Sequence, residues 1–440
     1  MSYKSIFEIV GPIMIGPSSS HTAGAVEIGL QMRAKLNGVL PSNIQIFLYE
    51  SFSKTGKGHA TDRAIIAGLL GFAKDDKRIK NAHEYARKEN IEIEINETNE
   101  SSPYLDNKGK PYANVAKIVA GDIILIGASI GGGAVIIKDE EEELTTSKFE
   151  PLYNNVSTLL ELSAKENKSI AQIAVLQELS LGIKTKSSLN ANMLENFNVM
   201  GRAIKVGING VKSSSGLSGG DAKKMHENIS KINLLGTCLN KAVTYALATA
   251  EVNASMDEKI CAVPTAGACG VVPGILFALK EEFNLDTERC IEFLITAGAF
   301  GLIVANNASI SGATGGCQAE VGTASAMAAA AMAITIGLTI EQSADAFSIA
   351  LSNLLGLVCD PIEGLVELPC INRNAIGVSN AFAAVQMVAS NITTKIHADC
   401  AIEAMNQVGN AMCSRFKETA EGGLAVTKSA KIIKEQLGLK

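Results

Sequence analysis

Two segments in the first third of the chain alternate between hydrophobic and polar residues. They are IQIFL at 44–48 and IEIEI at 91–95. A period of two is typical of β-strands that bury one face. Hydrophobic residues with helical spacing occupy residues 21–37 and 59–73. The pattern predicts a mixed α/β domain over residues 1–140.

Residues 121–138 (GDIILIGASIGGGAVIIK) combine two apolar runs with three consecutive glycines. Glycines between apolar runs favour a β-hairpin, because tight hairpin turns need residues that accept a positive φ. We therefore expect the turn at 131–133. Five acidic residues follow at 139–143. Such a run is typical of a solvated segment, and we expect an acidic linker over residues 141–150.

The remaining residues, 151–440, contain almost no strand pattern. Alanine-rich helical periodicity dominates this part of the chain, and glycine and proline interrupt it at intervals. These interruptions lie near residues 213–220, 263–274, 309–317 and 359–370. The pattern predicts an all-helical domain. The fold class expected for the whole chain is α+β, with an α/β domain followed by a larger all-α domain.

Two long stretches, 293–317 and 321–340, contain no charged residue. Both are rich in alanine, glycine and serine, and neither has the aromatic belt or the flanking basic residues of a membrane span. We therefore expect closely packed buried helices and no membrane association.

The amino-acid composition indicates which binding partners and which cellular compartment to expect. The 440 residues carry a net charge of −6 without a basic run, which argues against a nucleic-acid partner. Nine cysteines, none in a C-x-x-C pair, are typical of reduced thiols in the cytoplasm. The first residues lack the apolar core of a secretory signal. Because 47% of the residues are hydrophobic, we expect a homodimer.

A serine-rich stretch, GPSSSHTAG at 16–24, precedes the first predicted helix. A helix N-terminus offers unpaired N–H groups and a positive dipole end, which suit an anion such as a carboxylate. His21 adds a group that transfers protons near neutral pH. Helix capping alone is the simpler alternative, but three serines beside a histidine favour a site. The substrate-binding candidates are Ser18, Ser19, Ser20 and Thr22.

A second histidine, His59, stands in a similar setting, SFSKTGKGHATD at 51–62. As at His21, a threonine follows and a helix is expected to begin. The segment does not match G-x-x-x-x-G-K-[ST], so it does not predict a nucleotide-binding P-loop. His59 is either a catalytic histidine or part of a helix cap.

The cysteines fall into groups by context. Those in helix-like sequence are expected to be small core residues: Cys238, Cys290, Cys400 and Cys413. Cys317, Cys359 and Cys370 lie instead beside glycine or proline, where loops can bring thiolates together. Three such ligands would suit a catalytic iron–sulfur cluster in which one iron lacks a protein thiolate. Cys261 and Cys269, which flank a PTAG loop, are rival ligands.

Longer motifs resemble a known family. GPSSSHTAG and SKTGKGHATD are similar to the β region of bacterial iron–sulfur L-serine dehydratases. Five further motifs resemble the α region of that family: SGLSGGD, ATAEVNASM, PTAGACGVVPG, ANNASISGATGGCQAEVG and LGLVCDPIEGLVELPCINRN. The resemblance covers nearly the whole chain in β-then-α order. It implies an α/β domain related to allosteric substrate-binding domains, followed by an all-helical catalytic domain.

The same resemblance implies a 4Fe–4S cluster held by Cys317, Cys359 and Cys370, and L-serine as the substrate. The hypothesis is β-elimination that yields pyruvate and ammonia, with His21 or His59 as the base. Among the polar residues of the helical region, Asn307 is added to the substrate-binding candidates; a helix cap is its alternative role. Two other functions stay open: a related iron–sulfur lyase acting on cysteine or threonine, and a non-catalytic iron–sulfur amino-acid sensor.

Overall fold

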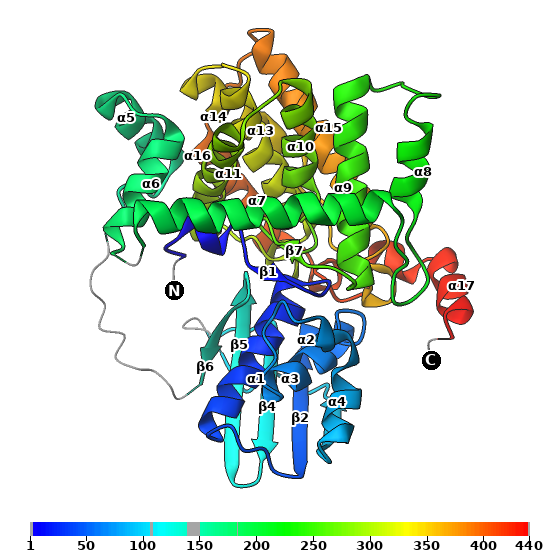
Figure 1. Ribbon diagram of the computed structural model, residues 1–440. Helices are drawn as coiled ribbons and strands as arrows, with labels where there is room; N and C mark the ends of the chain where they lie inside the picture. The colour runs from blue at the N-terminus through cyan, green and yellow to red at the C-terminus, as the bar shows by residue number, and fades with distance from the viewer. Residues whose placement is uncertain (1–2, 106–108, 139–149, 183, 439–440) are drawn as a thin grey trace.

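The structure is a computed structural model that describes residues 3–105, 109–138, 150–182 and 184–438. A sheet with flanking helices forms a smaller region, and most of the later residues form a larger helical region (Figure 1). The predicted α+β class is confirmed. The linker expected over 141–150 lies outside the described residues, except for Glu150.

The smaller region contains a five-stranded sheet in the order β3-β2-β4-β5-β6. Strands β2 and β3 are parallel, and the other neighbours are antiparallel. The strands are β2 (Asn43–Glu50), β3 (Glu92–Glu97), β4 (Asn114–Ala120), β5 (Ile123–Gly131) and β6 (Ala134–Ile137). The two predicted strands match β2 and β3, and the predicted hairpin matches β5 and β6. Strand β4 was not predicted, because valines on its half-buried face leave its sequence, NVAKIVA, without clear alternation between hydrophobic and polar residues.

Helices pack against this sheet and carry the predicted functional turns. They are α1 (Gly24–Lys35), α2 (Ser51–Thr55), α3 (Thr61–Leu69) and α4 (Ala82–Lys88). Helices α1 and α3 touch at two glycines: a Cβ on Gly68 would lie 2.0 Å from the Val26 carbonyl oxygen, and one on Gly29 would lie 2.2 Å from that of Ile65. This close approach packs the first half of α1 against the second half of α3.

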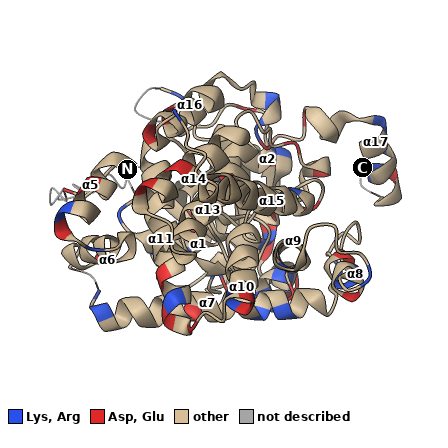
Figure 2. Cartoon of the chain, turned by 90° about the horizontal axis from the view of Figure 1, so that it is seen from above, with Lys and Arg blue, Asp and Glu red and all other residues tan. Residues whose placement is uncertain are grey.

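The larger region is a bundle crossed by the long helix α7 (Figure 1). Its helices are α5 (Val156–Glu166), α6 (Ile170–Ser180), α7 (Lys186–Ile208), α8 (Asp221–Asn228), α9 (Thr237–Ser255), α10 (Val271–Glu282), α11 (Thr287–Asn307), α12 (Gly312–Gly315), α13 (Thr323–Thr335), α14 (Ile340–Asn353), α15 (Cys370–Ala389), α16 (Ala398–Ala411) and α17 (Lys428–Gln436). In the view of Figure 2, the positions of charged residues lie mainly around the outside of the bundle.

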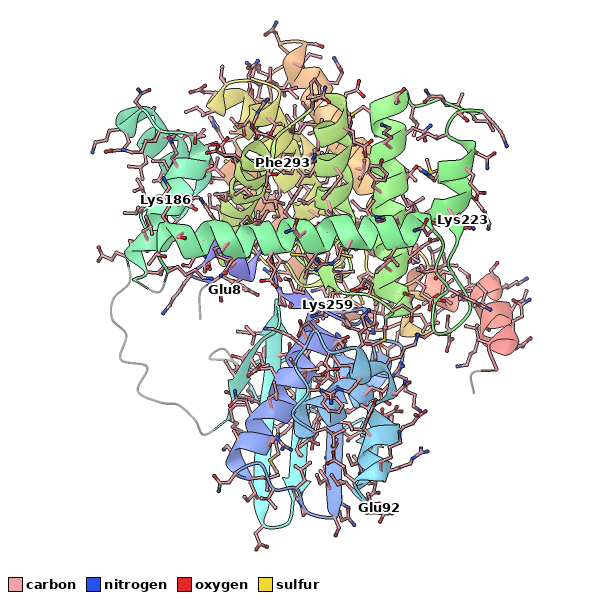
Figure 3. All side chains as sticks on the ribbon, viewed as in Figure 1. Glu8, Glu92, Lys186, Lys223, Lys259 and Phe293 are labelled. Atoms are coloured by element: carbon pink, nitrogen blue, oxygen red, sulfur yellow. The ribbon has the colours of Figure 1, made fainter. Side chains whose placement is uncertain are left out.

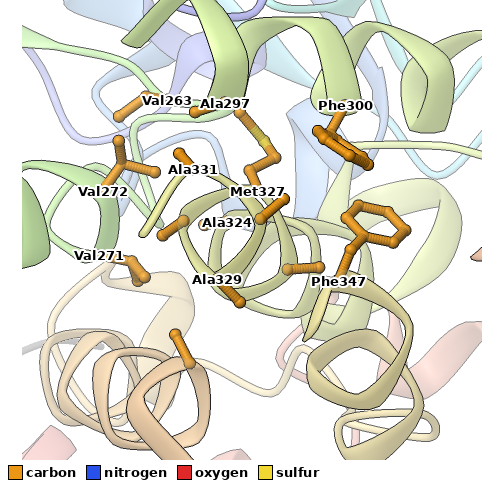
Figure 4. Close-up of a cluster of buried hydrophobic side chains, with 14 of the residues drawn as sticks. Val263, Val271, Val272, Ala297, Phe300, Ala324, Met327, Ala329, Ala331 and Phe347 are labelled. Atoms are coloured by element: carbon orange, nitrogen blue, oxygen red, sulfur yellow. The ribbon is translucent and has the colours of Figure 1, made fainter. Parts of the chain in front are cut away.

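Helix α13 lies at the centre of the bundle core. Its alanines and Met327 pack beside Phe300 and Phe347, whose stacked rings have centroids 5.1 Å apart (Figure 4). Helix α11 is long and apolar enough to span a membrane, but 78% of its apolar window is buried inside the fold. It is a core helix, as predicted for this stretch.

The four cysteines expected in the core differ in exposure. Cys290 is buried and Cys238 is half-buried, whereas Cys400 and Cys413 are exposed. The prediction is wrong for the last two, because Cys400 lies on the outer face of α16 and Cys413 lies just beyond its end.

The two regions are joined in several places. Strand β1 (Ile13–Met14) pairs antiparallel with β7 (Ile260–Cys261). Next to this pair, Lys259 forms an ion pair with Asp75 of the smaller region, and Figure 3 labels Lys259 where the regions meet. Nearby, Lys80 Nζ lies 2.6 Å from Asp257 Oδ1. These contacts hold the segment between α3 and α4 against the loop that follows α9.

The beginning of the chain packs with the bundle rather than with the sheet. Ile6, Ile9 and Val10 belong to the core of the helical region. The buried carboxylate of Glu178 in α6 accepts hydrogen bonds from the backbone N–H of Ile6 at 2.7 Å and from the hydroxyl of Ser5 at 2.8 Å. We call residues 3–10 the N-terminal arm.

Replacement of Gly68 by alanine is expected to destabilise the protein. The methyl group would overlap the Val26 carbonyl oxygen, so α1 and α3 would have to separate, which lowers the free energy of unfolding by about 1–3 kcal/mol. Chemical denaturation measures this change. Gly322→Ala is the matched control, because the nearest atom to its added Cβ is 3.6 Å away. Equal stability of the two variants would contradict the close contact.

Candidate active site

The two regions meet around a space that we call the inner cavity. Its walls come from the turn before α1, the segment between α2 and α3, and loops of the bundle. Its polar and ionisable lining residues are Ser18, His59, Cys317, Glu320, Cys359, Cys370 and Glu418. Residues from both ends of the chain therefore share one site.

The serine-rich stretch forms one turn of π-helix, Ser19–Ala23, that leads into α1. The Ser18 hydroxyl accepts a hydrogen bond from the backbone N–H of His21 at 3.1 Å, which makes Ser18 a helix cap as well as a lining residue. Asn253 of α9 donates to the Pro17 carbonyl at 3.0 Å and holds the turn against the bundle. The other hydroxyl candidates are buried and lie outside the described lining: Ser19, Ser20 and Thr22.

His21 is fully buried among hydroxyl groups. Its Nε2 atom lies 3.0 Å from Ser51 Oγ and 3.3 Å from Thr55 Oγ1, and its Nδ1 atom lies 3.2 Å from Ser20 Oγ. Burial, followed by the charge of His59, lowers the pKa of His21 to about 3. The ring is therefore neutral at pH 7. It stacks on the His59 ring with 4.3 Å between centroids.

His59 contacts Glu418, an acid from the last part of the chain. Its Nε2 atom lies 3.0 Å from Glu418 Oε1, and both side chains are buried. Its Nδ1 atom lies 2.9 Å from the Thr55 carbonyl oxygen and therefore carries a proton. The other carboxylate oxygen of Glu418, Oε2, forms no hydrogen bond within the described structure. It therefore has capacity left for a group in the inner cavity.

Glu418 is held in place through its backbone. Its N–H donates to the Cys359 carbonyl at 2.9 Å, and its own carbonyl accepts from the Ser51 hydroxyl at 3.2 Å. Its φ of 60° is left-handed, a conformation that costs a residue with a side chain about 1–2 kcal/mol. Burial acts to raise the pKa of Glu418, but the two histidines outweigh it and lower that pKa. Glu418 is therefore ionised at pH 7.

Glu320, in the turn before α13, is a second buried acid beside the cavity. Burial, followed by the charge of Glu418, raises the pKa of Glu320 to about 8. The side chain is therefore a neutral acid at pH 7 and can donate a hydrogen bond. The two acids sit in opposite protonation states within one site.

The structure brings Cys317, Cys359 and Cys370 to the same cavity. Cys317 follows α12, Cys359 lies in the loop after α14, and Cys370 begins α15. Burial, followed by Glu320, raises the pKa of Cys317 to about 12. Burial also raises the pKa of the other two thiols, and neighbouring acids and thiols add to the effect. Three thiolates at this place would need a compensating positive charge.

Arg373 supplies one positive charge beside these thiols. Its Nη2 atom lies 2.8 Å from Asp360 Oδ1, and its Nη1 atom donates to the Val358 carbonyl at 2.7 Å. The guanidinium thus ties α15, which begins at Cys370, to the loop that carries Cys359. It also acts to lower the pKa of Cys370 against the effect of burial.

Three other candidates lie away from the described lining of the inner cavity. Cys261 belongs to β7, and the Cys269 thiol points at the Thr249 carbonyl with 4.0 Å between the atoms. Asn307 is the last residue of α11, and its amide donates at 2.7 Å to the Asn154 carbonyl. Asn307 therefore stabilises a helix end, and its role in substrate binding stays a prediction.

Sequence analysis missed both acids of the site, and only one of them left a signal. Glu320 is the single charged residue between 293 and 340. A carboxylate alone in so long an apolar stretch is a candidate for a buried functional group. Glu418 stands in KETAEGG among other charged residues, so nothing in its local sequence separates it from a surface acid.

Buried ionisable groups that converge on one cavity between two regions are typical of an enzyme rather than of a structural protein. Comparison with known proteins agrees. The family described as serine dehydratase beta chain matches residues 5–111, and the family described as serine dehydratase alpha chain matches residues 140–425. The chain therefore belongs to the serine dehydratase family, with both parts in one polypeptide.

Individual relatives cover the chain to different extents. An L-serine dehydratase of Helicobacter pylori is 33% identical over 97% of this chain and 98% of its own length. An L-serine dehydratase of Escherichia coli is 33% identical over 96% of this chain and 98% of its own. A probable L-serine dehydratase alpha chain of Bacillus subtilis is 49% identical over 65% of this chain and 95% of its own.

The low pKa of His21 predicts a specific acid sensitivity. Below its ordinary pKa of 6.5, His21 takes up a proton in the unfolded chain but stays neutral in the folded protein down to about pH 3. The contribution of His21 to stability therefore falls as the pH drops below 6.5, by about 2 kcal/mol at pH 5. Glu320, whose pKa is raised, acts in the opposite direction in every variant, so the test is a difference between proteins. Urea denaturation at pH 7 and pH 5 should show a change in stability that is less favourable in the wild type than in His21→Asn. The exposed His226→Asn variant is the control, and equal changes in all three proteins would refute the assignment.

Proposed function

We propose that this protein is an L-serine dehydratase, which converts L-serine to pyruvate and ammonia in the cytoplasm. The observation that carries the proposal is one cavity lined both by three thiols and by the His59–Glu418 pair. The relatives named L-serine dehydratase over nearly the full chain support the choice of substrate. The homodimer expected from the sequence stays a prediction.

We further propose that Cys317, Cys359 and Cys370 hold a 4Fe–4S cluster. All three thiols are free and line one cavity, and their raised pKa values call for a positive partner. Among the described residues, their sulfur atoms do not all lie within 4.8 Å of one another. A single tetrahedral ion, with metal–sulfur bonds of about 2.3 Å, would draw them closer, so a larger cluster fits better. When bound, it supplies a Lewis-acidic iron that stabilises the departing hydroxide.

His59 is the better candidate for the base that removes the Cα proton. It lines the inner cavity, and its Nδ1 proton is fixed on the Thr55 carbonyl, which leaves Nε2 as the basic atom. Glu418 Oε1 lies 3.0 Å from the same nitrogen, so the carboxylate would accept a hydrogen bond from the proton that Nε2 takes up. His21 has a pKa of about 3 and lies behind His59, so its role is to position the base.

The substrate carboxylate would bind at the start of the helix that begins with Ser19. The first N–H groups of a helix have no partner within the helix, and Ser18 adds a hydroxyl at the cavity wall. Ser20 and Thr22 act indirectly, because Ser20 contacts His21 and the Thr22 hydroxyl donates to the His59 carbonyl at 2.8 Å. Loss of the Cα proton and the hydroxyl group leaves 2-aminoacrylate, which tautomerises and hydrolyses to pyruvate and ammonia without further help from the protein.

Reconstitution with iron and sulfide under anaerobic conditions tests the proposed function. We expect about four irons and four sulfides per chain, and pyruvate release from L-serine but not from D-serine. Serine substitutions at Cys317, Cys359 or Cys370 should lower both the iron content and the activity, because each removes a ligand. Cys400→Ser, which changes an exposed thiol, should retain both. Full iron binding by all three ligand variants would exclude this cysteine set.

The assignment of the base predicts unequal effects of histidine substitutions. His59→Gln is expected to lower kcat by about 10²- to 10⁴-fold with the iron content unchanged, because it removes the proton acceptor. His83→Gln, at a half-exposed histidine paired with Asp62, should keep wild-type turnover. Near-normal kcat in His59→Gln, with the iron intact, would show that another group takes the proton.

A further inference from the structure

A second cavity, which we call the outer cavity, adjoins the inner one. Pro17 and Val366 line both, so the two spaces are neighbours across these side chains. The outer cavity has a volume of about 190 Å³, several times the share of a water molecule in the liquid, which is about 30 Å³. A small solute can therefore occupy it before it passes inward.

One wall of the outer cavity carries a positive charge without a partner. Arg63, in the first turn of α3, is half-buried and lines the cavity. Its charge helps to lower the pKa of the neighbouring Asp62, but its guanidinium forms no hydrogen bond or ion pair with any residue that the structure describes. Lys57, another lining residue, is instead paired with Glu97 at 3.3 Å and is largely exposed. Arg63 is thus the group that remains free to bind an anion.

Another wall carries a negative charge without a basic partner. Glu367 is 4% exposed, and its carboxylate oxygens accept hydrogen bonds from the hydroxyls of Ser215 and Ser218, both at 2.6 Å. No lysine or arginine in the described part of the chain pairs with it. Glu367 directly precedes Leu368 in the loop that leads to Cys370, so the acid is fixed close to the inner site.

We propose that the outer cavity is the access vestibule of the enzyme and selects α-amino acids as zwitterions. Arg63 binds the carboxylate of the incoming molecule, and Glu367 binds its ammonium group. Opposite charges in the lining of one cavity complement a molecule that carries both charges on one carbon, and they disfavour a simple anion or cation. The molecule then passes Pro17 and Val366 to the inner cavity. This inference rests on the proposed function, because it names the route and the selectivity of the same reaction.

The test compares charge-neutral variants by steady-state kinetics on the reconstituted enzyme. Arg63→Gln is expected to raise KM for L-serine about tenfold with kcat within about twofold, because a capture contact acts on binding rather than on the chemical step. Salt should also weaken inhibition by the net anion 3-hydroxypropionate less in this variant than in the wild type, since salt screens the positive charge that binds the anion. Arg63→Lys should restore part of both. Arg87→Gln, at an exposed arginine of α4, is the control with the same loss of charge.

Inhibition by a serine analogue without the ammonium group distinguishes the role of Arg63 from that of Glu367. 3-Hydroxypropionate has the carboxylate and the hydroxyl of serine but no ammonium group. Its inhibition should weaken in Arg63→Gln and stay unchanged in Glu367→Gln, although Glu367→Gln raises KM for L-serine. Unchanged KM in Arg63→Gln, or equal effects of both variants on both compounds, would overturn the proposal.

The outcomes are distinguishable from a failure of the proposed function itself. If the reconstituted wild type releases no pyruvate from L-serine, the function is wrong before any variant is compared. If Arg63→Gln does not fold, Arg63→Lys and the wild-type inhibition by 3-hydroxypropionate decide the question: inhibition by this anion that is independent of salt would contradict capture by Arg63.

Discussion

The contact between His59 and Glu418 is the interaction on which the site depends. It joins the segment between α2 and α3 to the segment between α16 and α17, and both side chains are buried. A buried charge is stable only with a partner, so loss of either residue would leave the other uncompensated. The backbone of Glu418 is bonded to Cys359, and its carbonyl accepts from Ser51. The same short segment therefore aligns the histidines with the thiols.

Around this contact, the fold keeps neighbouring ionisable groups in different protonation states at pH 7. His21 is held neutral and Glu418 ionised, while Glu320 keeps its proton. Burial alone would neutralise all of them. The difference arises because Glu418 touches a histidine, whereas Glu320 experiences mainly the negative charge of Glu418. A site with both a proton acceptor and a neutral acid at pH 7 follows from these positions.

Much of this could be predicted from the sequence, because local patterns report on local structure. The alternation at 44–48 and 91–95 identified β2 and β3, and the glycines at 131–133 identified the hairpin. Helix-breaking residues beside three cysteines identified loops that meet at one cavity. Contacts between distant segments could not be predicted from local patterns. Glu418 has no local signal, and the Asn307 amide forms a hydrogen bond at a helix end, as an ordinary polar residue does.

The N-terminal arm has a consequence for how such enzymes can be assembled. The arm precedes the sheet in sequence, yet its isoleucines fill the core of the bundle and Glu178 clamps its backbone. Some relatives are named as a separate alpha chain and correspond to only 65% of this polypeptide. In a two-polypeptide version with this architecture, the subunit that carries the sheet would insert its N-terminal arm into the core of the helical subunit. The subunits would then share a hydrophobic interior and behave as an obligate pair rather than as exchangeable modules.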